Sequence, residues 1–316
     1  MRVIPLYVVL GGWLSMPALA AADADEWMSR LAKTEHTQSY SGIFVYERNG
    51  AFSSHAVWQG VEGDVVRERM LQLDGPASEV VRVNGELKCL STELAGQFSG
   101  GKAWHEQGFD THALSEWYEF RVIGDSRVAG REAVALAILP RDQHRYGFEL
   151  HLDRETALPL KSLLLSERGQ LLERFQFAHL DTGDVSERDL APSAACTAVA
   201  PGTEVGEPLE TGWRSDWLPV GFRLTKADVR PSPASDEPVS WLAYSDGLAS
   251  FSVFIEPLKG EVVEDARSQM GPTVAVSKRI TAAEGDVMVT VVGEIPPGTA
   301  ERVALSMRAG AAQAQR

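Results

Sequence analysis

Short segments in which apolar and polar residues alternate make up most of the chain after residue 40. They are rich in Val, Ile, Phe, Tyr and Trp, and turn residues such as Asn49-Gly50 separate them. Strands joined by tight turns pair antiparallel. The pattern predicts strands at 41–48, 54–59, 65–73, 79–83, 119–124, 133–139, 146–152, 160–166 and 171–180, and then at 222–226, 239–245, 249–256, 273–280 and 286–293.

Three stretches have helical character instead. Residues 23–38 begin with a capping residue at Asp23, and their apolar side chains recur at helical spacing. The residues that share this face are Trp27, Met28, Leu31 and Ala32. Asp110 is expected to cap a second short helix, and Thr299 to cap a closing helix through Met307.

A change in composition divides the chain into two domains. From residue 181 to 212 it is rich in Ala, Pro, Gly, Ser, Thr and Glu, which is typical of a linker. We expect a first domain at 21–200, a linker at 201–212 and a second domain at 213–310. The fold class expected is α+β: a large, curved antiparallel sheet, an unclosed half-barrel with helices on its concave side, followed by a smaller α+β domain.

The first twenty residues are typical of a secretory signal peptide. Arg2 precedes an apolar run, and Ala18 and Ala20 match the small-x-small cleavage pattern. A membrane anchor is the alternative, but the run is short for a bilayer and contains glycines. We therefore expect export to the periplasm, with no transmembrane segment in the mature chain.

Charge and cysteine content limit the partners of such a protein. The net charge is −14, which argues against nucleic acid binding. Residues 206–316 carry only −4 of it, so the second domain is the better candidate for a protein interface. In an exported chain the two cysteines, Cys89 and Cys196, favour a disulfide, with two separate buried thiols as the alternative.

Motifs that would indicate catalysis are weak. Gly96–Lys102 matches the start of a phosphate-binding loop, but Ala103 stands where Ser or Thr should follow. Gly124-Asp125-Ser126 is better explained as a turn than as a nucleophile elbow. The seven histidines show no metal-ligand spacing. We expect no enzyme, no catalytic residue, no metal and no cofactor.

Aromatic residues are dense on the strands of the first domain. A curved sheet whose concave face is incompletely covered forms an apolar cavity. We nominate Phe44, Tyr46 and Trp58 as residues that line such a cavity, with an ordinary packed core as the alternative.

Three segments resemble known families. Leu152–Lys161, with Phe175-Gln176-Phe177, resembles a strand–turn–strand of the LolA-like lipoprotein-carrier superfamily, except that Ala157 stands where carriers often have Gly. Trp217–Phe222 and Tyr244–Glu256 resemble the C-terminal domain of the MucB/RseB family. Together the segments make the chain similar to MucB/RseB over nearly its whole mature length.

The resemblance implies a regulator. Members of this family bind the periplasmic segment of a membrane anti-sigma factor of the MucA/RseA type and shield it from site-1 proteolysis. They thereby restrain an envelope-stress, alginate-type sigma factor until lipid or lipopolysaccharide releases them. A lipid or lipoprotein carrier of the LolA type is the alternative, although a carrier does not need the second domain. Whether identical chains associate stays open.

The hairpin 244–256 is the expected surface for the anti-sigma partner. The residues nominated for it are Tyr244, Asp246, Gly247, Phe251, Phe254 and Glu256. Along its second strand Phe251, Val253 and Ile255 should face the core, which leaves Phe254 on the opposite, otherwise polar set. Phe254 is therefore the candidate aromatic anchor, with packing under the closing helix as the alternative.

Overall fold

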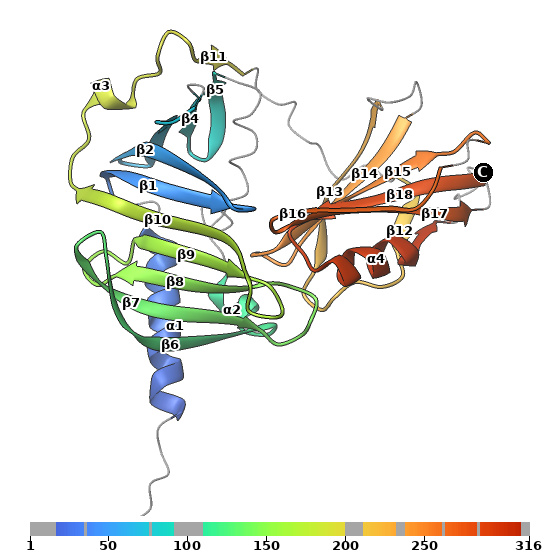
Figure 1. The fold of residues 1–316 in the computed structure, drawn as a ribbon, viewed down its shortest axis with the longest axis horizontal. Helices are drawn as coiled ribbons and strands as arrows, with labels where there is room; N and C mark the ends of the chain where they lie inside the picture. Colours follow the sequence, from blue (N-terminus) through green and yellow to red (C-terminus); the bar gives the residue numbers. More distant parts are fainter. Residues whose placement is uncertain are drawn as a thin grey trace, which may run out of the picture.

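Two antiparallel sheet domains form the molecule (Figure 1). The structure is a computed structural model that describes residues 17–34, 37–75, 78–91, 110–199, 211–231, 238–260, 263–282 and 285–310. Its helices are α1 (Pro17–Thr34), α2 (Thr111–Leu114), α3 (Glu187–Leu190) and α4 (Pro297–Ser306). Of the predicted signal peptide, residues 1–16 lie outside the described part, and residues 17–20 form the start of α1.

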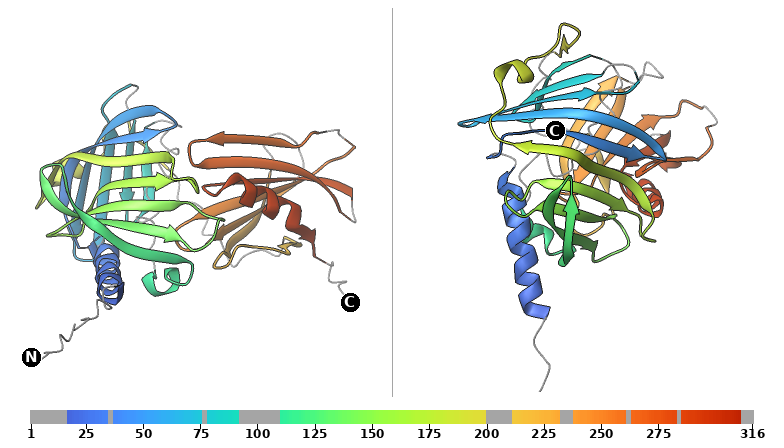
Figure 2. Two further views of the ribbon diagram at one scale, coloured as in Figure 1. Left: turned by 60° about the horizontal axis from the view of Figure 1, so that its bottom comes forward. Right: turned by 60° about the vertical axis from the view of Figure 1, so that its left-hand side comes forward.

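The first domain is an open sheet of eleven strands. They are β1 (Tyr40–Arg48), β2 (Ala51–Glu62), β3 (Val65–Gln72), β4 (Glu79–Val83), β5 (Glu86–Leu90), β6 (Tyr118–Val128), β7 (Arg131–Pro140), β8 (Gly147–Asp153), β9 (Pro159–Leu165), β10 (Leu171–Thr182) and β11 (Thr197–Ala198). The order is β11-β5-β4-β3-β2-β1-β10-β9-β8-β7-β6. β1 and β10, which are far apart in sequence, pair within the sheet, and the two outermost strands, β11 and β6, do not pair with each other. The sheet curls, as both views in Figure 2 show. The α+β class with an unclosed antiparallel sheet is confirmed.

Helix α1 packs against the part of the sheet that contains β6, β7 and β8. Trp27, Met28 and Leu31 are buried in one cluster with apolar residues of those strands. The helix begins before Asp23 and ends at Thr34, four residues earlier than expected, because the Thr34 carbonyl accepts the N–H groups of Thr37 and Gln38. Asp110 caps α2, as predicted, by accepting the N–H groups of His112 and Ala113.

The second domain is a six-stranded sheet with one helix. Its strands are β13 (Arg223–Pro231), β14 (Pro238–Ser245), β15 (Ser250–Pro257), β16 (Ala266–Met270), β17 (Thr273–Ala282) and β18 (Gly285–Gly293), in the order β13-β14-β15-β18-β17-β16. β12 (Trp213–Ser215) and β19 (Met307–Ala309) form a separate pair. Helix α4 buries Ala300, Val303 and Ala304 against one face of the sheet. The closing helix stops at Ser306, one residue before its expected end, and the prediction that Thr299 caps it is wrong, because the helix begins at Pro297 with Pro296 at the N-cap.

Turn chemistry explains most strand boundaries. Asn49 and Gly50 both have positive φ, which is the conformation of the predicted two-residue hairpin. The turn expected at Gly124-Asp125-Ser126 is wrong: these residues belong to β6, which continues through a bulge to Val128, and the chain turns at Ala129-Gly130. Ala157 has a φ of 62°, which explains why glycine suits this position in similar turns.

A disulfide joins Cys89 on β5 to Cys196, with the two Cα atoms 5.5 Å apart. Cys196 leads into β11, which pairs with β5 beyond it. The first half of the low-complexity segment is therefore held on the first domain. Residues 201–210 of the predicted linker lie outside the described part of the chain.

Candidate functional site at the domain boundary

A buried ion pair connects the two domains. Arg145, in the turn before β8, donates to Asp246 in the turn between β14 and β15 at 2.9 Å, and both side chains are fully buried. Tyr118 donates its hydroxyl to the same carboxylate at 3.1 Å, and Arg145 also donates to the Val220 carbonyl. A charge that is removed from water is stable only when it is paired and hydrogen-bonded. Because Arg145 finds these partners in the second domain, its burial depends on the contact between the two domains.

The turn that carries Asp246 inserts into the first domain. Leu248 is buried in the same apolar cluster as Trp27 and Leu114, which both belong to the first domain. Asp246 stabilises the turn by accepting the backbone N–H groups of Leu248 and Ala249. This turn therefore joins the two domains.

Close packing continues at the entrance to the second domain. Gly221 has a φ of +92°, and a Cβ atom built there would lie 2.5 Å from the Trp117 ring. On the other side His144 meets the Trp217 ring edge-on at 5.0 Å and lies 3.1 Å from the Thr299 hydroxyl.

A second polar cluster crosses the boundary at the end of the β1–β2 hairpin. Arg48 reaches from β1 to Thr273 and Glu294 of the second domain, the latter at 3.2 Å. It also lies 3.6 Å from Glu173 on β10, whose carboxylate accepts the Tyr46 hydroxyl at 2.5 Å. One guanidinium thus serves two carboxylates from different domains.

Burial gives this cluster unusual protonation behaviour. Burial, and then the charge of Glu294, raise the pKa of Glu173 to about 7, although Tyr46 and Arg48 oppose the shift. Burial also raises the pKa of Glu294, against the opposing effect of Arg48. The two carboxylates therefore share too little positive charge for both to remain ionised easily.

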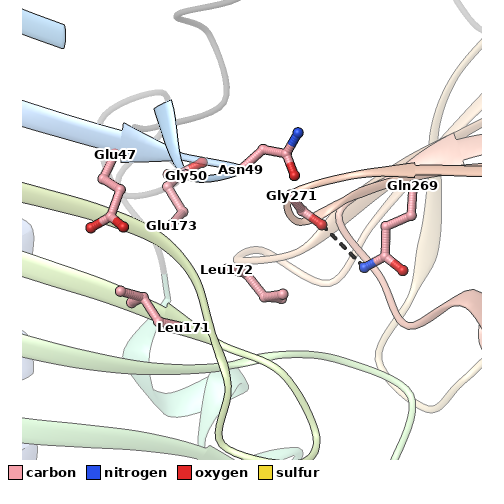
Figure 3. A pocket seen from close by; sticks show the side chains of 8 residues that line it. All are labelled: Glu47, Asn49, Gly50, Leu171, Leu172, Glu173, Gln269 and Gly271. Carbon is pink, nitrogen blue, oxygen red and sulfur yellow. Dashed lines mark hydrogen bonds between the residues drawn. The ribbon is translucent and has the colours of Figure 1, made fainter. Parts of the chain in front are cut away.

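Next to this cluster a pocket of about 430 Å³ opens between the domains. Glu47, Leu171 and Glu173 line it from the first domain, and Gln269 and Gly271 line it from the second (Figure 3). The lining combines acidic side chains with two leucines. Such a mixed cleft at a domain boundary suits an extended polypeptide better than a small apolar ligand.

Family models match both domains of this chain. The MucB/RseB N-terminal domain matches residues 23–195, and the MucB/RseB C-terminal domain matches residues 207–308. The chain belongs to the MucB/RseB family. The resemblance seen in the segments Trp217–Phe222 and Tyr244–Glu256 is thereby confirmed.

Characterised members of the family are similar over most of their length. The chain is 57% identical over 314 residues to the sigma factor AlgU regulatory protein MucB of Pseudomonas aeruginosa, with 99% of each chain covered. It is 31% identical over 252 residues to the sigma-E factor regulatory protein RseB of Escherichia coli, with 78% of each covered.

Solved MucB structures show the same fold. The complex of P. aeruginosa MucA and MucB matches at a TM-score of 0.83 with 57% identity, covering 92% of this chain and all of that one. A second structure, of MucB with MucA(peri), gives 0.82 at 56% identity and the same coverage. A structure described as MucB gives 0.67 at 56% identity, covering 91% of this chain and 98% of that one. That structure therefore superposes less closely on this chain than the two complexes do, at nearly the same identity and coverage.

Some of the residues nominated for the partner surface are buried, and others are accessible. Tyr244 and Phe251 are buried in the second domain's core, and Asp246 is buried at the domain boundary, because the hairpin turn packs on the first domain. These three side chains are not presented to a partner. Gly247 is exposed, but a Cβ there would touch Leu114.

Phe254 lies on the face of the second sheet away from α4. The alternation predicted for β15 is confirmed, with Phe251, Val253 and Ile255 buried and Phe254 half-buried. Phe254 pairs in register with Trp241, so two aromatic side chains share this face. Glu256 is half-buried on the same face.

The nominated cavity residues do not share one surface. Phe44 and Tyr46 are buried on one face of β1, where Phe44 stacks on His55 at 5.0 Å. Trp58 pairs with Ser41 and therefore lies on the opposite face, near the Arg69 guanidinium. The face on which Trp58 lies could have been deduced from the sequence, because the two-residue Asn49-Gly50 turn fixes the pairing of every residue along β1 and β2.

A serine–histidine–glutamate row was not expected. Ser126 on β6 lies 2.7 Å from Nδ1 of His151 on β8, and Nε2 of His151 lies 2.8 Å from Glu149. Such geometry resembles a nucleophile with its base. The row runs across β6, β7 and β8, and Ser126 lies within strand β6 and not at a strand-to-helix elbow of the kind that exposes a nucleophile.

Among the residues that the structure describes, no group of three His, Cys, Asp or Glu side chains is arranged to hold a metal ion. In the same part of the chain, no helix combines the length and apolar character needed to cross a bilayer.

Proposed function

We propose that this protein is an exported, periplasmic regulator that binds the periplasmic segment of an anti-sigma factor of the MucA/RseA type. By covering that segment it limits site-1 proteolysis, and so restrains a sigma factor of the AlgU type. The observation that carries the proposal is 57% identity to the AlgU regulator MucB over 99% of both chains.

The domain arrangement supports partner binding. Two MucB structures with MucA match this chain at TM-scores of 0.83 and 0.82, against 0.67 for the structure described as MucB. We infer that the contacts of Arg145 with Asp246 and of Arg48 with Glu294 belong to the arrangement that receives the anti-sigma segment. The pocket lined by Glu47 and Gln269 is the proposed place of first contact.

Release by lipid or lipopolysaccharide is the second part of the proposal. Tyr46 lies next to Phe44 along the apolar face of β1 and also donates to Glu173, which contacts the domain boundary through Arg48. A ligand that displaces Tyr46 would disturb the contact between Arg48 and the second domain. A ligand can release the partner only if it favours a different arrangement of the domains.

A protection assay tests the proposal. The full chain is mixed with a purified periplasmic segment of a MucA-type anti-sigma factor, and cleavage by the site-1 protease is followed over time. We expect cleavage to slow in proportion to the complex formed, and lipopolysaccharide to restore it. Unchanged cleavage at saturating protein would refute the regulator.

The alternative function is a carrier of lipid or lipoprotein. In that case the protein would transfer bound lipid to acceptor vesicles whether or not the anti-sigma segment is present. Transfer without any protection of the segment would favour the carrier. We also propose that the protein is not an enzyme, although the Ser126–His151–Glu149 row places a base next to a hydroxyl.

A further inference from the structure

The cluster of Tyr46, Arg48, Glu173 and Glu294 has one positive charge for two carboxylates, and it spans both domains. Arg48 approaches Glu173 at 3.6 Å within the first domain and Glu294 at 3.2 Å in the second. Glu173 is 9% exposed and Glu294 26% exposed, so water screens their repulsion weakly. Protonation of one of the two carboxylates would balance the charge of the cluster while the domains are in contact.

We propose that this cluster makes the contact between the domains depend on pH, so that the contact strengthens as the pH falls through neutrality and weakens as it rises. The groups that face Glu173 are few. Tyr46 and Arg48 face it from β1, Glu294 faces it from the second domain, and Leu164 of β9 pairs with it without adding charge.

The surroundings of the cluster do not cancel the excess negative charge. Glu47 pairs with Arg174 on the neighbouring strands at 3.4 Å. Burial raises the pKa of the nearby Tyr146, the charges of Glu167 and Glu294 raise it further, and the charge of Arg267 lowers it. The balance at Glu173 therefore depends on Arg48 and Glu294.

The sign follows from what changes when the domains separate. Burial is the largest cause of the raised pKa of Glu173, and the charge of Glu294 is the next. Separation removes the Glu294 charge and leaves Arg48 to serve Glu173 alone, so the pKa of Glu173 falls below about 7. The joined form then binds more protons than the separated form. Joined domains are favoured below neutrality, and this advantage is lost as the pH rises through about 7, by up to about tenfold per pH unit in the window between the two pKa values.

Energy transfer between dyes on the two domains tests the proposal. Dyes are attached through non-natural amino acids at Glu86 and Leu305, two exposed positions on different domains, in the full chain. We expect transfer to change toward the joined form as the pH falls from 8.5 to 5.5. Constant transfer in the wild type over this range would overturn the proposal.

Three variants locate the titrating group. Glu173→Gln should hold the joined form at every pH, and Glu294→Gln should move the midpoint to lower pH because the repelling charge is gone. Glu47→Gln is the matched control and should keep the wild-type response. A wild-type response in Glu173→Gln, or a response lost in Glu47→Gln, overturns the assignment. If Glu173→Gln does not fold, an unchanged midpoint of the pH response in Glu294→Gln overturns the assignment instead.

Discussion

Arg145 and Asp246 are 101 residues apart in sequence, yet they form a fully buried ion pair that holds one domain against the other. Arg145 also pairs with Asp142 of its own domain at 3.1 Å, whereas the cation that pairs with Asp246 comes from the other domain. The pair makes the relative position of the domains a cooperative property of the fold.

Neutralising one partner should separate the domains. Asp246→Asn keeps the Oδ1 acceptor for Leu248 and Ala249, but it leaves the buried Arg145 charge with Asp142 as its remaining carboxylate partner. Breaking a buried pair in this way costs about 3–5 kcal/mol. We expect calorimetry to show two unfolding transitions in place of one. Asp216→Asn, which removes an exposed partner of Arg214, is the control and should cost about 1 kcal/mol or less. A single transition at the wild-type temperature would contradict this account.

The disulfide should stabilise the first domain. Cys89 and Cys196 close a loop with a sequence separation of 107 residues, and in the entropic model a loop of this size contributes about 4–5 kcal/mol. Cys196→Ser in the presence of Cys89→Ser should lower the denaturant midpoint of the first domain only. Hydrogen exchange should rise in β11 and in β5 beside it. Equal midpoints for the variant and the wild type would show that the crosslink has no such role.

His55 should make stability depend on acidity. Burial lowers the pKa of His55 to about 4, because the ring is enclosed beside Phe44. The unfolded chain therefore binds a proton more readily, and folding free energy is lost as the pH falls from about 6.5 toward 4, by about 3 kcal/mol. His55→Phe should unfold with a weaker dependence on pH across this window. His179→Phe, at an exposed position, should retain the wild-type dependence.

Phe254 should contribute to partner binding and little to folding. It lies on the sheet face away from α4, so Phe254→Ala should weaken binding of the anti-sigma segment at least tenfold with a nearly unchanged melting temperature. Phe251→Ala is the matched control, because Phe251 is buried in the core and its loss should cost about 3–5 kcal/mol. Titration calorimetry and thermal unfolding separate the two effects. Wild-type affinity in Phe254→Ala would place the partner elsewhere.

The Ser126–His151–Glu149 row should be structural. Ser126 lies within strand β6 and not at a strand-to-helix elbow, so we expect no turnover of nitrophenyl esters above the buffer rate. Ser126→Ala should leave this background unchanged and cost about 1 kcal/mol of stability through the lost hydrogen bond. Turnover that disappears in Ser126→Ala would instead establish a hydrolase.

Alternation along the strands made most of the sheet predictable from sequence. β16 was missed because Ala266–Met270 has no apolar side that is buried, and all five residues are exposed. β5 was missed because it is short and carries charged residues at both outward positions. Local pattern therefore identifies strands that cover a core and overlooks strands that only extend an edge.

The site was less predictable because it is formed between distant segments. Nothing near Arg145 in the sequence indicates Asp246, and nothing near Arg48 indicates Glu294. Tyr244 and Phe251 are buried in the core of their own domain, and Asp246 is buried because a hairpin turn that appears free in sequence is covered by the other domain. The Trp58 assignment, in contrast, was accessible through the register of the Asn49-Gly50 hairpin.

Gly221 gives the family-specific segment Trp217–Phe222 a second meaning. Its missing side chain is the space that the Trp117 ring occupies, and its backbone conformation excludes most other residues. Any larger residue there would clash with the Trp117 ring and push the two domains apart without changing the charge of either. One genetic change could therefore yield two intact but merely tethered halves, and so reveal what each half does without the other.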